Sequence, residues 1–200
     1  MNKKIAVIAH RGAKGAAPEN TLAAARLAHS QGADMWELDT ALTRDGIPVL
    51  MHDDGLMRTS NVAIRPTFVH RHPWLLEQFT RAELRELDAG AWFSPQFSGE
   101  PIPTLEDALR LSAQLNFPVN VELKDYAASP QNTRALVEQS LKLIARLDLA
   151  ELVLISSFSV PALQVARDLA PHLALAVLFE RDDMDGLINI CRSLKARAAH

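Results

Sequence analysis

The sequence predicts a single domain of the α/β class with a mainly parallel sheet. Short runs rich in β-branched and apolar residues alternate with amphipathic stretches of helical length, a pattern typical of parallel α/β folds. Ionisable residues also stand at the ends of several expected strands, where parallel folds assemble their functional sites. The chain has 200 residues, 48% of them apolar, which is enough for one domain covering residues 1–200.

The expected elements alternate regularly, with one irregular interruption. Strands are expected over 5–10, 35–42, 48–52, 119–123, 152–156 and 173–179. Helices are expected from about Asn20 to a stop at Gly32, over 104–115, 132–147 and 160–169, and from about Met184. A turn at Arg44-Asp45-Gly46 joins the second and third strands directly. Residues 53–103 are irregular, apart from a helical piece around 80–87, and are expected to form an inserted subdomain.

These elements fit a TIM (β/α)8-type barrel with a small insertion after strand three. Six strands are two fewer than such a barrel needs, and residues 197–200 lie in or just after the sixth helix. We therefore expect a barrel that is C-terminally truncated to about six strands and lacks its last two βα units. Strands one and six would then carry unpaired edges, through which the chain could associate with itself.

Composition excludes several classes of protein. The formal net charge of -3 gives no basic face for nucleic acid. No apolar stretch is long enough to cross a bilayer, and the run at 5–9 is too short for a signal peptide. We expect a cytoplasmic protein without stable membrane insertion. Cys191 is the single cysteine, which excludes an internal disulfide and a multi-cysteine metal site, and we expect a buried or half-buried, unreactive thiol.

The residues suited to chemistry gather at the carboxyl ends of the expected strands. His10 ends the first strand and His52 ends the third. Residues two apart in a strand point to the same face, so Glu37 and Asp39 can face one ion, and Glu122 and Lys124 can face the same cavity. One such residue is usually only a surface or capping residue, but several in otherwise apolar strands would be costly to bury without a function.

Three carboxylates from two strands form an oxygen-rich cluster of the kind that binds Mg²⁺ or Ca²⁺. A divalent cation beside Arg11 and Lys124 could neutralise a phosphoryl group, while histidines supply and remove protons near neutral pH. The pattern therefore predicts metal-dependent phosphodiester chemistry on a small molecule.

Five segments of the chain are distinctive: IAHRGAKGAAPENTLAA, WELDTALTRDGIPVLMHDDGLMRTSN, LDAGAWFSPQFSGEPIPTLEDAL, VNVELK and ISSF. They resemble, in this order, the opening motif, the second block and the later blocks of the glycerophosphodiester phosphodiesterase family, in its cytoplasmic bacterial form. The resemblance runs in order over nearly the whole chain, and it departs from the family at 62–78, which is longer than usual and holds His70-Arg71-His72.

The resemblance implies hydrolysis of glycerophosphodiesters to sn-glycerol 3-phosphate and an alcohol, in glycerol and lipid metabolism. It implies a divalent cation, Mg²⁺ or Ca²⁺, and assigns a role to each of seven residues. The metal ligands would be Glu37, Asp39 and Glu122; the acid and base would be His10 and His52; Arg11 and Lys124 would hold the phosphate. Phe158 follows the fifth expected strand at the functional edge of the sheet, and we expect it to form a wall of the substrate pocket.

Other residues carry weaker expectations. Asp53 is expected to orient His52 by accepting its second ring proton. Asn20 and Thr21 suit helix capping as well as substrate contact, and Trp92 and Phe93 suit packing of the insertion as well as a substrate pocket. The His70-Arg71-His72 run is expected to be a solvated loop.

Two alternative functions stay open at this point. An apolar groove formed by Phe68, Trp74, Leu75 and Leu76 would favour a lysophospholipase D-like enzyme acting on lipids. A barrel opened by the missing strands would favour an inactive protein that only binds metal or phosphate.

Overall fold

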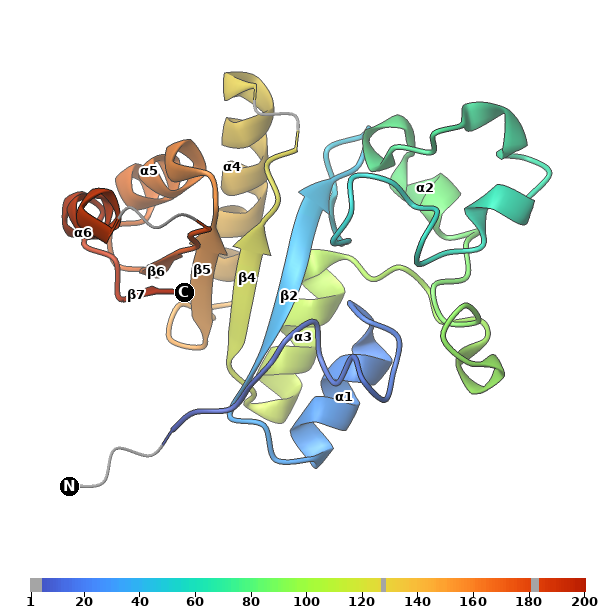
Figure 1. Cartoon of the computed structure of the whole chain (residues 1–200), viewed down its shortest axis with the longest axis horizontal. Helices are drawn as coiled ribbons and strands as arrows, with labels where there is room; N and C mark the ends of the chain where they lie inside the picture. The colour runs from blue at the N-terminus through green and yellow to red at the C-terminus, as the bar shows by residue number, and fades with distance from the viewer. Residues whose placement is uncertain (1–4, 127–128, 181–183) are drawn as a thin grey trace.

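The structure is a computed structural model that describes residues 5–126, 129–180 and 184–200. These residues form a seven-stranded sheet in the order β1-β2-β4-β5-β6-β7, with β3 paired to β2 outside that path (Figure 1). The strands on the path pair in parallel, and β3 pairs antiparallel to β2. The strands are β1 (Ile8–Ala9), β2 (Met35–Leu42), β3 (Pro48–Leu50), β4 (Val119–Leu123), β5 (Val153–Ser157), β6 (Ala174–Val177) and β7 (Ala198–Ala199). The expected α/β fold, a parallel half-barrel of six strands, is confirmed.

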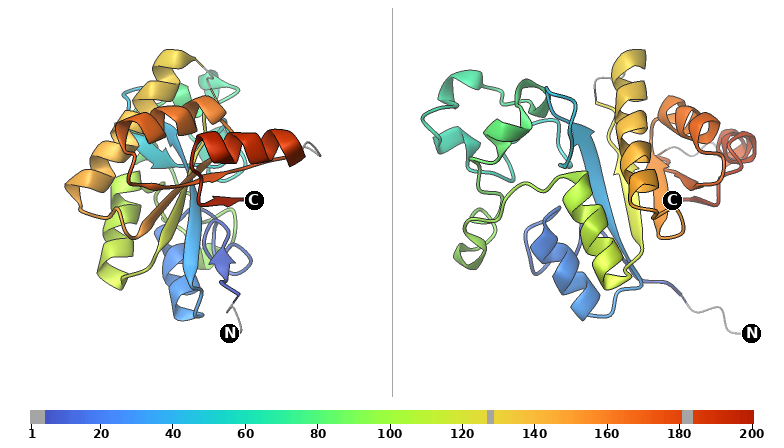
Figure 2. Two further views of the ribbon diagram at one scale, coloured as in Figure 1. Left: turned by 90° about the vertical axis from the view of Figure 1, so that its left-hand side faces the viewer. Right: turned by 180° about the vertical axis from the view of Figure 1, so that it is seen from behind.

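Helices cover the outer, convex side of this half-barrel (Figures 1 and 2). They are α1 (Leu22–Ser30), α3 (Leu105–Leu115), α4 (Pro130–Arg146), α5 (Val160–Leu169) and α6 (Met184–Ser193). Their buried residues share one core with alternate strand residues such as Trp36 and Leu38, which point away from the barrel interior. The intervening residues Glu37 and Asp39 therefore face the interior.

Residues between β3 and α3 pack into a second core beside β2, at the end of the sheet far from α6 (Figure 2). The strand β3 serves both cores, because Leu50 packs with the helices whereas Val49 and Met51 pack with the second core. Phe68 and Trp74 are buried in the second core, so they do not form an exposed apolar groove. The expected helical piece at 80–87 is shorter, as α2 (Arg81–Leu84), and the rest of 53–103 is irregular apart from four three-residue 3-10 turns.

Two short strands depart from the sequence prediction. The strand expected over 5–10 is reduced to β1, because His10 already begins the turn that leads to α1. Residues 197–200 were expected to lie in or just after the last helix, but Ala198–Ala199 form β7, parallel to β6. The edge expected at strand one is confirmed, since β1 lies at one edge of the sheet, but β7 and not the sixth expected strand (β6) lies at the other. The third expected strand also ends early, at Leu50, so that His52 lies in a loop.

Two smaller expectations can also be compared with the structure. Cys191 is half-buried against the main core, as expected. Arg71 does not point freely into solvent, because its guanidinium lies 2.6 Å from the Glu83 carboxylate and 4.9 Å from the centre of the Phe79 ring. No helix in the described ranges is long and apolar enough to cross a membrane.

The turn after β1 depends on Gly12. Its φ of +78° lies in the left-handed region, and a Cβ there would come within 2.7 Å of backbone and side-chain atoms of Ala24. The absence of a side chain therefore lets this turn lie directly on α1 and fixes the direction in which the chain leaves β1.

We predict that Gly12→Ala destabilises the fold by about 2–4 kcal/mol, because a left-handed conformation and a backbone clash combine. Gly46→Ala isolates the first effect, since Gly46 has a φ of +74° and open space around it, and should cost about 1 kcal/mol. Gly15→Ala is the control, with neither constraint. Urea unfolding of the three variants measures the differences, and equal losses for Gly12→Ala and Gly46→Ala would show that the close approach to Ala24 is unimportant.

Candidate active site

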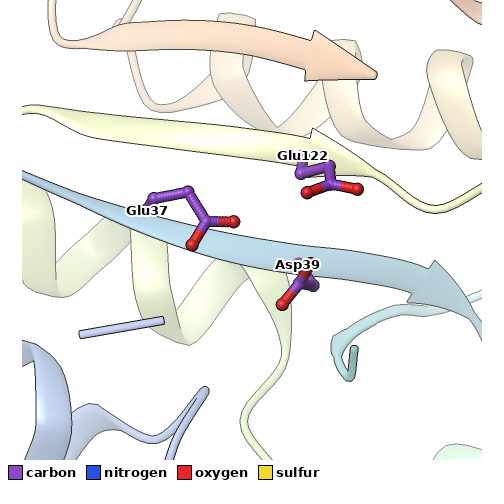
Figure 3. A group of neighbouring side chains, drawn as sticks. All are labelled: Glu37, Asp39 and Glu122. Atoms are coloured by element: carbon purple, nitrogen blue, oxygen red, sulfur yellow. The ribbon is translucent and has the colours of Figure 1, made fainter. Parts of the chain in front are cut away.

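Three carboxylates meet on the inner face of β2 and β4. Asp39 and Glu122 are direct partners in the parallel register, and Glu37 lies two residues earlier on β2. One ligand oxygen from each lies within 4.8 Å of the others, and the side chains point toward a common space (Figure 3). The structure thus brings together the three residues that the sequence analysis proposed as metal ligands.

The cluster is buried, with exposed fractions of 7% for Glu37, 0% for Asp39 and 7% for Glu122. Burial removes the water that would stabilise each negative charge, and the neighbouring carboxylates repel one another. Burial first, and then the charge on Asp39, raises the pKa of Glu37 to about 8. Burial also raises the pKa of Glu122, although the hydrogen bond from Lys124 opposes the shift. Without another cation, this cluster holds a proton in preference to a full negative charge.

Several polar atoms around the cluster accept or donate no hydrogen bond within the described residues. They include Oε1 of Glu37 and Oδ1 of Asp39, although Lys124 Nζ lies 3.4 Å from the latter. Asn120 Oδ1 and Ser156 Oγ, on the same face of β4 and β5, are also buried without partners. Buried polar atoms are nearly always paired, so an unpaired group of oxygens indicates a bound species. Hard carboxylate oxygens suit Mg²⁺ or Ca²⁺, and these residues therefore fit a divalent cation.

Two cations flank the carboxylates. Lys124 Nζ donates to Oε1 of Glu122 at 2.8 Å, and Arg11 Nε lies 3.4 Å from Oδ2 of Asp39. The backbone N–H of Arg11 also donates to Oε2 of Glu37 at 2.7 Å. Both side chains are only partly exposed, so their charges act in a poorly hydrated space and offset part of the carboxylate repulsion.

Asn20 holds Asp39 in place. Its side-chain amide donates to Oδ2 of Asp39 at 2.8 Å, and its carbonyl oxygen accepts from the Asp39 backbone N–H at 3.0 Å. The Asn20 backbone has a φ of +57°, a conformation that asparagine tolerates better than most residues. Thr21 caps α1, because its hydroxyl accepts from the N–H of Ala24. The two motif residues therefore have separate structural tasks, and the Asn20 contact was not foreseen from the sequence.

His10 lies at the open edge of the cluster, with its side chain 54% exposed. Its Nε2 is 3.8 Å from Oε2 of Glu37, and its Nδ1 is 2.9 Å from Nζ of Lys14. Partial burial, followed by the positive charges on Lys14 and Arg11, lowers the pKa of His10 below its usual value. The imidazole is therefore neutral at pH 7 and able to accept a proton.

His52 is the first member of a chain of hydrogen bonds. Its Nδ1 lies 2.6 Å from Oδ1 of Asp53, which confirms the contact expected from the sequence. Arg58 contacts both oxygens of Asp53, at 2.6 and 3.0 Å, and both oxygens of Glu19, at 2.8 Å each. Glu19 in turn accepts from Arg11 at 3.0 Å. These contacts link His52 to Arg11 through alternating acids and bases, and the hydrogen bonds from Arg58 lower the pKa of Asp53 to about 2.

The aromatic candidates divide into two groups. Phe158 is 49% exposed and its ring centre lies 6.0 Å from Nζ of Lys124, so it borders the cluster. Trp92 and Phe93 instead pack edge-to-face at 5.7 Å, and the Trp92 ring N–H donates to the backbone oxygen of Ala89. These contacts assign the two residues to the packing of the insertion, one of the two roles considered for them.

Glu19 and Arg58 were not identified from the sequence, although both stand inside the quoted motif blocks. Their side chains interact across 39 positions of the chain, and a single sequence contains no signal that pairs them. Only their residue types indicate a contact, because arginine and carboxylate side chains commonly form two parallel hydrogen bonds with each other.

The chain matches the glycerophosphoryl diester phosphodiesterase family over residues 10–196. It is 37% identical over 177 residues to a glycerophosphodiester phosphodiesterase of Caldanaerobacter subterraneus subsp. tengcongensis, covering 88% of this chain and 68% of that protein. It is 32% identical over 190 residues to a glycerophosphodiester phosphodiesterase of Bacillus subtilis, covering 90% and 61%. The chain thus spans about two-thirds of the length of these relatives.

A phosphodiesterase of Oleispira antarctica, solved in complex with the product sn-glycerol-3-phosphate, has a similar structure. The TM-score is 0.85 at 34% sequence identity, and the match covers 98% of this chain and 74% of that one.

We predict that Glu37→Gln removes metal binding but stabilises the metal-free chain. Because the pKa of Glu37 is raised to about 8, the folded state holds a proton that the unfolded state loses, and stability falls as the pH rises from about 4.5 to 8. The neutral amide avoids this loss. At pH 8 the melting temperature of metal-free Glu37→Gln should exceed that of the wild type by several degrees.

Magnesium or calcium should raise the melting temperature of the wild type, more at pH 8 than at pH 6, because proton and cation compete. The variant should show no such shift. Glu151→Gln changes an exposed carboxylate in the turn before β5; it is the control and should behave as the wild type. An unchanged metal-induced shift in Glu37→Gln would exclude this residue as a ligand.

Proposed function

This chain belongs to the glycerophosphoryl diester phosphodiesterase family, and we propose that it hydrolyses glycerophosphodiesters to sn-glycerol 3-phosphate and an alcohol. The observation that carries the proposal is a buried group of three carboxylates flanked by two cations, with His10 at its edge and His52 bound to Asp53 nearby. The relatives' names and the product-bound structural neighbour support the same reaction. The substrate is a small molecule with a single phosphodiester.

Glu37, Asp39 and Glu122 would hold one divalent cation, Mg²⁺ or Ca²⁺. When bound, the cation neutralises negative charge on the phosphoryl oxygens and so favours nucleophilic attack at phosphorus. The raised pKa of Glu37 and the unpaired carboxylate oxygens support this assignment, because both would be relieved by a cation.

Arg11 and Lys124 would bind the phosphate, since each projects a partly buried positive charge into the same space as the carboxylates. His10 would accept a proton from the water molecule that attacks phosphorus, because its lowered pKa keeps it neutral at pH 7. His52, oriented by Asp53, would return a proton to the departing alcohol. Phe158 would form a wall beside the phosphate, next to Lys124.

The alternatives are less well supported. Phe68, Trp74 and Leu76 lie in the core of the insertion, so an exposed apolar groove for acyl chains lacks three of its four expected members. Against an inactive remnant, Arg11 and Lys124 lie within 3.4 Å of Asp39, and His10 lies 3.8 Å from Glu37. His52 is connected to Arg11 by the hydrogen bonds that run through Asp53, Arg58 and Glu19. We also propose that 53–103 is an inserted subdomain of one barrel-type domain, 1–200. The cytoplasmic location and self-association through the sheet edges stay predictions.

We predict that His10→Ala and His52→Ala each lower kcat for glycerophosphocholine by at least about 100-fold, the usual effect of losing an acid or base catalyst. The measurement is release of glycerol 3-phosphate with added Mg²⁺ or Ca²⁺. His172→Ala, an exposed histidine outside the site, is the control and should retain wild-type activity. Chelation of the metal should abolish activity in every variant. Turnover that survives either histidine change, or full activity in excess chelator, would contradict the proposal.

Arg58 is a positioning residue, and we predict that Arg58→Gln lowers kcat by about 10-fold while KM changes little. The loss of its four contacts frees Asp53, so His52 is less often aligned, whereas the phosphate-binding cations remain. Arg58→Lys should recover part of the loss, but not all, because lysine cannot bridge two carboxylates in a planar fork. Arg134→Gln, which breaks an exposed ion pair on α4, is the control. A rise in KM at constant kcat would assign Arg58 to substrate binding instead.

A further inference from the structure

A cavity of about 610 Å³ opens beside the candidate active site. It lies where the end of β2, the insertion and the start of α4 meet, and Lys124 is at its boundary. Part of the cavity wall is apolar and is formed by Leu42, Leu75 and Leu136. The cavity therefore adjoins the proposed phosphate site and is large enough for more than one small substituent.

The charges that line this cavity are unevenly balanced. The positive groups are engaged, since Lys124 pairs with Glu122 and Asp39, and Arg44 lies 3.5 Å from Glu83. By contrast, the side chains of Asp54 and Glu77 make no ion pair or hydrogen bond within the described residues. The cavity thus offers two uncompensated carboxylates to whatever enters it.

Asp125 is the third carboxylate of the lining, and it is already used. One of its oxygens accepts hydrogen bonds from Thr133 at 2.8 Å and from Ser159 at 2.9 Å, which ties the loop after β4 to α4 and α5. Asp125 is therefore structural, and the free negative charge belongs to Asp54 and Glu77.

Tyr126 adds an aromatic surface to the same cavity. Its side chain is partly exposed, and burial of its hydroxyl raises its pKa further above the ordinary value. The negative charges of Asp39, Asp53, Glu122 and Asp54 act in the same direction. The phenol stays neutral, and it lies within electrostatic reach of both the metal-site carboxylates and Asp54. A neutral aromatic face beside carboxylates is a favourable environment for an ammonium group.

We propose that this cavity binds the alcohol portion of the substrate, and that Asp54, Glu77 and Tyr126 select alcohols bearing a positively charged nitrogen. The inference rests on the proposed function, because it places the phosphate at Lys124 and the departing alcohol beyond it. The glycerol portion carries no charge, so a cation-binding site can discriminate only between alcohols. Primary and quaternary ammonium groups are the chemical class that fits, and a neutral polyol gains nothing from the two carboxylates.

The test compares kcat/KM for glycerophosphocholine, glycerophosphoethanolamine and glycerophosphoglycerol, the last with a neutral alcohol. We expect the two cationic substrates to be preferred by about 10-fold, mainly through KM, and the preference to shrink at high salt. Asp54→Asn and Glu77→Gln should each lower kcat/KM for the cationic substrates by about 3-fold and leave the neutral one unchanged. Tyr126→Phe should keep the preference, because the ring remains, and Tyr126→Leu should reduce it.

Glu151→Gln removes one exposed charge in the turn before β5, outside the cavity, and controls for the change in net charge. Equal kcat/KM for cationic and neutral substrates in the wild type would overturn the inference. Equal losses on both classes in Asp54→Asn and Glu77→Gln would also overturn it.

Absence of turnover on all three substrates would instead count against the proposed function. In that case calorimetric titration of metal-loaded protein with glycerophosphocholine and glycerophosphoglycerol decides the inference by itself. Tighter binding of the cationic compound, lost in Asp54→Asn, supports the inference, and equal or absent binding of both refutes it.

Discussion

The mutual repulsion of three buried carboxylates is the constraint on which the rest of this structure depends. Glu37, Asp39 and Glu122 share a small, poorly hydrated space on two neighbouring strands. Burying an unpaired charge costs several kcal/mol, so the fold must place positive charges and hydrogen-bond donors beside these carboxylates. Arg11 and Lys124 arrive from the ends of β1 and β4, and Asn20 fixes Asp39 through two hydrogen bonds. The turn around Gly12, with its left-handed backbone, directs Arg11 into this position.

The insertion helps to position His52 relative to the carboxylates. The carboxylates lie on β2 and β4, which pair in parallel, but His52 follows β3, which pairs antiparallel to β2. That strand lies between two cores, with Leu50 on one side and Val49 and Met51 on the other. Because the residues directly before His52 pack into both cores, the start of its loop is held in a fixed position. The bridge from Asp53 through Arg58 to Glu19 then restricts it further, and ties it to the turn that carries Arg11.

Much of this arrangement is predictable from the sequence, for reasons that differ between its parts. The alternation of strands and helices gives the fold class, and the spacing of two between Glu37 and Asp39 gives their shared face. Strands of two residues, such as β1 and β7, carry no periodicity, and only pairing with a neighbouring strand defines them. The link between Glu19 and Arg58 spans 39 positions and depends on packing of the insertion against the turn after β1, which no local pattern encodes.

Compensation at the carboxylate cluster also bears on how the proposed site changes between its metal-free and metal-bound forms. Arg11 forms an ion pair with Asp39, and Lys124 forms one with Glu122. The pKa of Glu37 is raised to about 8, so its carboxyl group stays protonated near neutral pH. A divalent cation held by these carboxylates would offset their charge, so they would no longer need both side chains, and Glu37 would no longer need its proton. Arg11 and Lys124 would then have charge available for a phosphate. The side chains that stabilise the carboxylates in the metal-free protein would thus also be the ones that bind substrate, so that cation and phosphodiester would favour each other's binding.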